Sequence, residues 1–181
     1  AGVVTNGKTL HSNSHSAVEI GHTKVIDSQT QCYCGAKGCL ETEISIPQLI
    51  KKAQHLAQEN PTSILNQYPI TVETLCDAVL IGDKQALDII NLVAQRLGFI
   101  LAVMGHIFNP QKILIGSPLC RAKSTLFPLI LSSIQHHVLP RYAHNLVIEE
   151  TELRNKGTLP AASLVKEALY NGSLLLELMQ G

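Results

Sequence analysis

The chain has 181 residues, of which 45% are hydrophobic and 15% charged, and its 14 basic side chains balance its 14 acidic ones. Such a composition can build a buried core, which argues against a disordered protein. A net charge of zero gives no support to nucleic-acid binding through a basic face of this chain. The most apolar stretch, residues 89–108, is interrupted by polar and charged side chains, so we expect no membrane span.

The chain begins in what reads as a strand already under way, without an initiator methionine or a secretory signal. We therefore expect a piece of a longer, cytoplasmic protein. Residues 2–5 and 8–10 flank the turn-forming pair Asn6-Gly7, which predicts a β-hairpin. Residues 27–40 hold cysteines and glycines without a periodic pattern, so we expect a loop that something else must order.

Three helices are predicted in the middle of the chain. Apolar residues at helical spacing place the first over 46–59, with Ser45 as its N-cap. The second covers about residues 72–80, and the third runs from just after Asp83 to about residue 108. The third is so apolar that we expect burial on more than one side. An internal core helix is favoured, and a helix at a dimer interface is the alternative.

Strands and helices alternate in the rest of the chain. Residues 112–115 form a short apolar β run, which is typical of a strand covered on both faces. A helix over about 124–138, a strand at 146–148 and helical segments at 158–170 and 173–179 follow. This order predicts an α/β architecture with a mixed sheet.

Three of the five cysteines, Cys32, Cys34 and Cys39, lie close together, and His22 precedes them. An odd cysteine count without a secretory signal argues against a disulfide framework and favours a reducing compartment. One imidazole and three thiolates match the closed tetrahedral shell of structural zinc. We therefore predict that these four residues bind structural Zn²⁺. Free thiols in a surface loop are the alternative, and catalytic zinc is disfavoured because four protein ligands leave no open position.

The other two cysteines, Cys76 and Cys120, lie in predicted helices among apolar neighbours, so we expect small buried side chains. The remaining histidines have no matching metal partners, and we expect them at the surface or at the edge of the core. They are His11, His15, His55, His106, His136, His137 and His144.

The segment around the predicted zinc ligands resembles the signature of the ROK family, which joins bacterial sugar-responsive repressors, sugar kinases and related open reading frames. Its residues are Glu19-Ile20-Gly21-His22 and then Cys32-x-Cys34-Gly35-x-x-Gly38-Cys39-Leu40-Glu41. Residues 109–116 resemble a later strand and turn of that family. The tail, residues 161–175, looks closest to the N-acetylglucosamine repressor branch, and the resemblance covers essentially the whole chain.

The resemblance implies an α/β, actin-like and hexokinase-like (ribonuclease H-like) fold, in which two lobes enclose a sugar site. Residues 1–181 would be the C-terminal lobe, with a zinc-binding loop, and would serve effector binding and oligomerisation. The N-terminal sugar lobe and a winged helix-turn-helix domain would lie upstream, outside this chain.

The resemblance places the family's sugar contacts on Glu19, His22 and Glu41. A carboxylate can accept hydrogen bonds from two hydroxyls, and His22 can ligate zinc through one ring nitrogen and bind sugar through the other. From the residues alone, Glu19 and Glu41 are more typical of solvated surface carboxylates. With the resemblance, we expect both to contact the sugar.

Kinases of this family tend to carry glycines just before the Glu-x-Gly-His motif and a second glycine after Gly116, because backbone must approach phosphate closely there. This chain has Ser12, His15, Val18 and Ser117 at those places. The substitutions favour a binding module over an enzyme. We expect a repressor of amino-sugar utilisation genes, and an ATP-dependent sugar kinase, similar to a glucokinase or N-acetylglucosamine kinase, is the alternative.

The resemblance also implies partners. We expect N-acetylglucosamine, as its 6-phosphate, to be the inducer, and operator DNA to bind the upstream domain. A homodimer or homotetramer follows from the role of such repressors, which read palindromic operators. Docking of a phosphotransfer-system protein is a further alternative for which these residues give no marker.

Overall fold

The computed structural model describes residues 1–10, 18–25, 28–144, 146–152, 166 and 170. The helical segment predicted at 158–170 therefore falls outside the described residues, apart from Lys166 and Tyr170, which are helical. The segment at 173–179 and the family-like tail lie outside them as well.

The N-terminal hairpin pairs strand β1 (Val4–Thr5) with strand β2 (Lys8–Thr9) in antiparallel register. Asn6 and Gly7 between them have φ angles of 51° and 73°. Two left-handed residues in succession are what a type I′ hairpin turn requires, and asparagine and glycine adopt that conformation at low cost. The predicted hairpin is confirmed.

The helices fall into two groups along the chain. The first group consists of the short helix η1 (Ile20–His22), α1 (Leu40–Ile44), α2 (Ile46–Glu59), η2 (Ile64–Asn66), α3 (Val72–Leu80) and α4 (Lys84–Phe108). The second group consists of η3 (Pro118–Ala122), α5 (Lys123–His137) and α6 (Pro140–Ala143). The four helices predicted within the described residues are confirmed, whereas α1 was not foreseen because five residues carry too little periodicity.

Of the three helices α2, α3 and α4, two begin at a residue whose side chain caps the helix. Asp83 accepts a hydrogen bond from the backbone N–H of Ala86 at 3.0 Å and begins α4, and Thr71 forms a reciprocal capping box with Thr74 at the start of α3. Ser45 occupies the N-cap position of α2, but its side chain makes no capping hydrogen bond.

Strand β3 (Lys112–Ile115) pairs in parallel with β4 (Val147–Glu150), and α5 forms part of the crossover between them. The expected mixed sheet is not seen as one unit. Within the described residues, the four strands form two separate pairs, one antiparallel and one parallel. Each strand of the hairpin pairs over only two residues.

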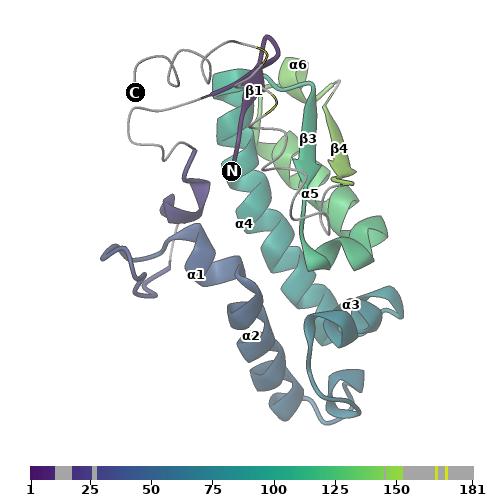
Figure 1. The fold of residues 1–181 in the computed structure, drawn as a ribbon. Helices are drawn as coiled ribbons and strands as arrows, with labels where there is room; N and C mark the ends of the chain where they lie inside the picture. The colour runs from purple at the N-terminus through teal and green to yellow at the C-terminus, as the bar shows by residue number, and fades with distance from the viewer. Residues whose placement is uncertain (11–17, 26–27, 145, 153–165, 167–169, 171–181) are drawn as a thin grey trace.

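Helix α4 is the centre of the molecule, with α1 and α2 on one side and α5 with β3 and β4 on the other (Figure 1). By length and composition alone it could cross a membrane. Its packing against helices on several sides is instead that of a core helix, as expected. Gly98 lets α5 approach closely, because a β-carbon there would lie 2.5 Å from Cβ of Ser133.

Candidate metal centre and sugar site

The segment from residue 28 to residue 39, here called the metal loop, is folded by a few backbone hydrogen bonds. Cys32 N–H donates to the carbonyl of Ala36 at 2.8 Å, and Gly35 N–H donates to Cys32 at 3.0 Å. Gly38 has a φ of 74°, and a β-carbon there would lie 2.5 Å from the carbonyl oxygen of Ser28. Only glycine fits this close approach, so the loop needs Gly38 to bring its cysteines together.

The four predicted zinc ligands converge. One ligand atom from each of His22, Cys32, Cys34 and Cys39 lies within 4.8 Å of the other three. Nδ1 of His22 is 3.7 Å from Sγ of Cys32, and the sulfurs of Cys34 and Cys39 are 3.6 Å apart. All five cysteines are free, and a disulfide would require about 2.05 Å between sulfurs.

These separations suit a tetrahedral ion. Two ligands at ordinary Zn–S and Zn–N distances from one tetrahedral ion are about 3.5 to 3.8 Å apart. The two measured separations of 3.6 and 3.7 Å fall in that range. Three thiol sulfurs and one imidazole nitrogen are also the donor set that borderline-soft Zn²⁺ prefers, so the residues present fit the ion.

The thiols differ in their acidity. The pKa of Cys34 is lowered, first by the backbone N–H of Ala36 and then by hydrogen bonds from Cys32 and Cys39. Desolvation, followed by hydrogen bonding to Cys34 and Cys32, raises the pKa of Cys39 to about 12. A buried thiol of this kind loses its proton only when a cation compensates the thiolate charge, and a divalent metal ion supplies that compensation.

Glu43 anchors the metal loop to α1, although its side chain is only 7% exposed. The hydroxyl of Ser28 donates to its carboxylate, and the hydroxyl of Thr30 lies 3.4 Å from the same oxygen. No local pattern predicts this role, because glutamate is usually exposed. A buried carboxylate that keeps its hydrogen-bond donors ties the loop to a helix.

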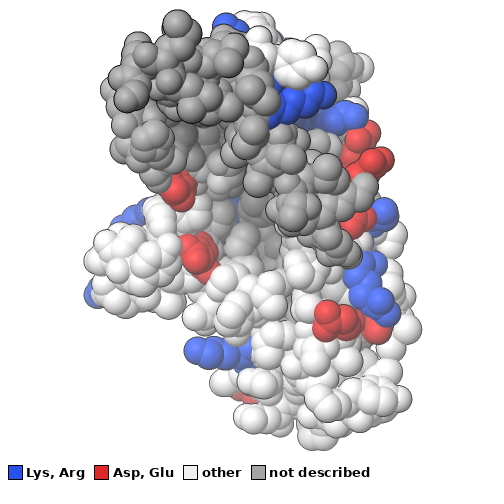
Figure 2. Space-filling view, in the orientation of Figure 1, with Lys and Arg blue, Asp and Glu red and all other residues white. Residues whose placement is uncertain are grey.

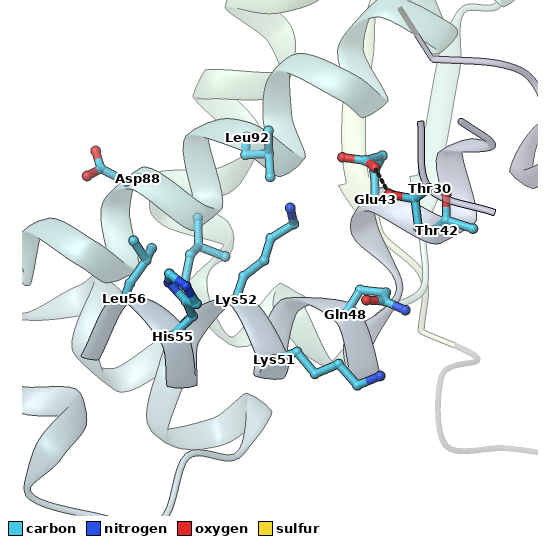
Figure 3. A pocket seen from close by; sticks show the side chains of 11 residues that line it. Thr30, Thr42, Glu43, Gln48, Lys51, Lys52, His55, Leu56, Asp88 and Leu92 are labelled. Carbon is cyan, nitrogen blue, oxygen red and sulfur yellow. Dashed lines mark hydrogen bonds between the residues drawn. The ribbon is translucent and has the colours of Figure 1, made fainter. Parts of the chain in front are cut away.

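Glu43 and Thr30 also border a hollow of about 570 Å³ between α2 and α4 (Figure 3). Lys52 on α2 extends into this hollow, whereas Lys51 points away from α4. None of the three predicted sugar contacts lines it, so the hollow is separate from the candidate sugar site.

The predicted sugar contacts gather on one side of the metal loop. Glu19 and Glu41 are exposed and His22 is half-buried. The Glu41 carboxylate lies against η1, since a β-carbon on Gly21 would be 3.6 Å from its Oε2 atom. The structure therefore brings Glu41 close to the turn that carries His22.

Tyr33 joins this group, and the sequence reasoning missed it. Its hydroxyl lies 3.0 Å from Nε2 of His22, on the opposite edge of the ring from Cys32. The pKa of Tyr33 is raised by desolvation and then by the charge of Glu41, with smaller contributions from Cys32, from a hydrogen bond to Glu41 and from Glu19. Its position between two predicted ligands was the available signal, because the backbone of such a residue must lie beside the metal.

Val18 and Ser117 stand where the resembling kinases tend to carry glycine, and their local structures differ. Val18 has a φ of 58°, which is a glycine-like conformation held by a valine. The hydroxyl of Ser117 accepts from the N–H of Leu119 at 3.2 Å and caps η3. A β-carbon on Gly116 would lie 2.8 Å from Cγ2 of Thr151. Ser12 and His15 lie outside the described residues.

Other histidines and cysteines behave as expected where they are described. His55 pairs with exposed Glu59 at 3.5 Å, and Nε2 of His106 accepts from the backbone N–H of Leu139 at 3.3 Å. Cys76 and Cys120 are buried. Among the described residues, the group that could hold a metal contains none of these side chains. His11 lies outside those residues.

Charged side chains are interspersed on the face shown in Figure 2, with basic and acidic groups close to one another over the described residues. Exposed ion pairs in the described part of the chain include Arg121 with Asp77 at 2.7 Å and Lys112 with Glu149 at 2.8 Å. The mixed pattern agrees with the zero net charge, and the described residues on the face of Figure 2 show no basic stripe.

Comparison with known proteins identifies the family, because the model of the ROK family matches residues 1–168. This chain belongs to the ROK family. It is 50% identical to the DNA-binding transcriptional repressor Mlc of Escherichia coli strain K12, over 100% of this chain and 45% of the relative. It is 33% identical to the transcriptional dual regulator NagC of the same strain, over 99% of this chain and 44% of the relative.

Enzymes of the ROK family are related as well. A glucokinase of Halalkalibacterium halodurans is 32% identical over 92% of this chain and 52% of the enzyme. A solved ROK family transcriptional regulator, described as a homologue of the Escherichia coli Mlc protein, superposes with a TM-score of 0.89 at 35% identity, over 99% of this chain and 46% of that chain. This ROK chain therefore has the expected actin-like, hexokinase-like α/β fold.

The chain spans about half the length of the ROK relatives it matches. The family-level resemblance is confirmed. The N-acetylglucosamine repressors are among the relatives, but their identity of 33% is below the 50% shared with Mlc. The inducer expected from the resemblance therefore stays a prediction.

Proposed function

We propose that this chain is the effector-binding part of a transcriptional repressor of the ROK family. In the complete protein it would form the C-terminal lobe, preceded by a sugar lobe and a winged helix-turn-helix domain. The match to about half of a DNA-binding repressor, over the whole of this chain, supports that placement. The observation that carries the proposal is the arrangement on η1, where Nε2 of His22 lies 3.0 Å from the Tyr33 hydroxyl and the Glu41 carboxylate lies against Gly21 of the same turn.

The candidate metal centre would orient His22, one of the three predicted sugar contacts. His22, Cys32, Cys34 and Cys39 would hold a structural zinc ion, as their converging ligand atoms allow. A bound zinc ion would fix the orientation of the imidazole and keep its proton on Nε2. His22 would then present a directed N–H donor to the effector, while the neighbouring carboxylates remain acceptors.

The side chains of Glu19, Glu41 and His22 are suited to bind a sugar. Glu19 and Glu41 are exposed carboxylates, and each can accept hydrogen bonds from more than one hydroxyl. His22 adds a donor at fixed orientation. One donor between two acceptors matches the alternating hydroxyls of a sugar ring better than it matches a phosphate, which would require cationic groups.

Effector binding would regulate DNA binding by a shift between conformations. A sugar that contacts both lobes favours their closed arrangement by its difference in affinity for the two states. If the closed arrangement separates the DNA-binding domains of a homodimer or homotetramer, the operator is released. N-acetylglucosamine 6-phosphate remains the inducer expected from the resemblance, and glucose is the competing candidate.

A sugar kinase is the second candidate function, and the relationship to glucokinases favours it. Ser117 and Val18 argue against it, since each has a β-carbon where the resembling kinases tend to have glycine. The Ser117 hydroxyl also caps η3, which is a structural role that glycine could not fill.

The test uses the complete protein and its operator. Fluorescence anisotropy would follow operator release by glucose, N-acetylglucosamine and N-acetylglucosamine 6-phosphate. We expect one sugar to release DNA, and Glu41→Gln to raise the required concentration about tenfold or more, because a hydrogen bond to a charged group contributes about 1.5–3 kcal/mol. Glu59→Gln, at an exposed position on α2, is the matched control.

Two outcomes would contradict the proposal. Operator binding that no sugar alters would remove the sensing role. ATP-dependent phosphorylation of a sugar well above the uncatalysed rate would favour the kinase instead.

A further inference from the structure

Tyr33 has a fixed backbone and an exposed side chain in the metal loop. It lies between Cys32 and Cys34, inside a turn closed by the hydrogen bond from Gly35 N–H to the carbonyl of Cys32. Its backbone is therefore fixed on both sides, yet its side chain is 81% exposed. The phenol can leave its position by side-chain rotation alone, which is fast for an exposed residue and needs no rearrangement of the loop.

The Tyr33 hydroxyl contacts Nε2 of His22, the ring nitrogen on the opposite edge from Cys32. The hydroxyl lies 3.0 Å from Nε2, and the two rings meet edge to face with centroids 5.1 Å apart. If Nε2 carries the ring proton, the His22 N–H donates to the phenol oxygen.

We propose that Tyr33 is an internal competitor of the effector, because it holds the position on Nε2 of His22 that a sugar hydroxyl would take. This inference rests on the proposed function and concerns the same site. One N–H makes one strong hydrogen bond, so the phenol and a sugar hydroxyl cannot both use Nε2. Effector binding then requires Tyr33 to rotate away.

The competition also selects the kind of ligand. Displacement of the phenol breaks its contact with Nε2 of His22. A ligand hydroxyl restores that contact, whereas a ligand without a hydroxyl leaves the imidazole N–H without its partner, which is costly. Tyr33 therefore favours effectors that present a hydroxyl to His22, as a sugar ring does, over apolar ligands.

The test compares Tyr33→Phe with the unaltered complete protein, and uses Tyr68→Phe as the matched control. Tyr68 is also exposed, at 63%, and lies on a different surface, beside η2 and α3. Calorimetric titration with glucose, N-acetylglucosamine and N-acetylglucosamine 6-phosphate would measure affinity. We expect Tyr33→Phe to bind the active sugar about two- to tenfold more tightly, the effect of one ordinary hydrogen bond, with zinc content unchanged.

Nitrogen-15 spectra of the His22 imidazole give a readout that needs no sugar. We expect the Nε2 resonance to shift in Tyr33→Phe and to stay in place in Tyr68→Phe. Equal or weaker sugar binding by Tyr33→Phe, or an unshifted Nε2 resonance, would overturn the role of Tyr33 and leave the proposed function intact. If no sugar binds any of the three proteins, the proposed function fails and the competition fails with it.

Discussion

The metal loop and the helical body of this protein are stabilised in different ways. Helices α2 to α5 share a continuous apolar core in which side chains such as Leu49, Leu75 and Ile90 are fully buried. The loop side has a small cluster of Val25, Leu40 and Ile100, joined by partly buried neighbours. The body folds because it removes apolar surface from water, whereas the loop depends on polar anchors and, as proposed, on a metal ion.

Helix α1 connects the two regions. Leu40 belongs to the small apolar cluster, and Glu43 three residues later receives the hydroxyl of Ser28. One turn of helix thus carries both an apolar contact and the polar anchor of the loop. The candidate site therefore lies on the part of the fold with less apolar packing of its own, where that part joins the helical body.

Removal of zinc should give the largest effect and separate the two regions most clearly. We expect chelation, or the substitution Cys34→Ser, to abolish zinc binding and remove amide-exchange protection over residues 28–39. The amides of α4 should stay protected, because their core does not include the metal. Metal analysis and hydrogen exchange would check this. Loss of protection in α4 as well would show that the two regions are not independent.

The substitution Gly38→Ala should damage the loop alone. An alanine at its φ of 74° is strained by about 1–2 kcal/mol, and its β-carbon would also meet the Ser28 carbonyl oxygen at 2.5 Å. We expect zinc affinity to fall more than about tenfold.

Gly35→Ala is the control for Gly38→Ala, since Gly35 has a φ of 91° but no heavy atom within 4 Å of the added carbon. Gly35→Ala should have the backbone strain without the steric clash. Competition with a zinc-binding dye would compare the zinc affinities of the two variants. Equal losses would mean that the contact with Ser28 does not matter.

Gly98→Ala tests the body in the same manner. The added carbon would lie 2.5 Å from Cβ of Ser133, where α4 and α5 pack together. We expect the free energy of unfolding to fall by about 1–3 kcal/mol, as overpacking usually costs, with zinc content unchanged. Gly105→Ala in the same helix meets its nearest atom at 3.4 Å and should be neutral or slightly stabilising. Urea unfolding would measure both variants.

The substitution Asp83→Ala should give the smallest effect, and one that depends on pH. Desolvation works against its charge, but hydrogen bonds from Ala86, Ile64 and Ser63 outweigh it and lower the pKa of Asp83. A lowered folded-state pKa stabilises the protein above the unfolded-state pKa, and this stabilisation is lost as pH falls through the folded-state value. We expect a loss of about 0.5–2 kcal/mol at neutral pH.

That difference should shrink on acidification below about pH 4, where the unfolded aspartate takes up its proton. Thermal unfolding across pH would show it, and Asp88→Ala on the exposed side of the same helix is the control. A difference that stays constant from neutral to acidic pH would exclude the charge of Asp83 as its source.

Elements with local signals were predictable from the residue order alone. The turn at Asn6-Gly7, the start of α4 after Asp83 and the apolar period of α4 each depend on residues a few positions apart, and all were predicted where the structure has them. The four predicted metal ligands were identifiable for the same reason, because their spacing and chemistry are both visible in a short segment.

Contacts between residues far apart in the chain became known only from the folded structure. Glu43 is buried because the loop folds back onto α1, and Tyr33 reaches His22 because the turn at Cys32 aims its side chain there. The separation of the strands into two pairs is likewise a matter of long-range pairing. Such contacts depend on how the chain closes over many residues, and no local pattern of residue types encodes that geometry.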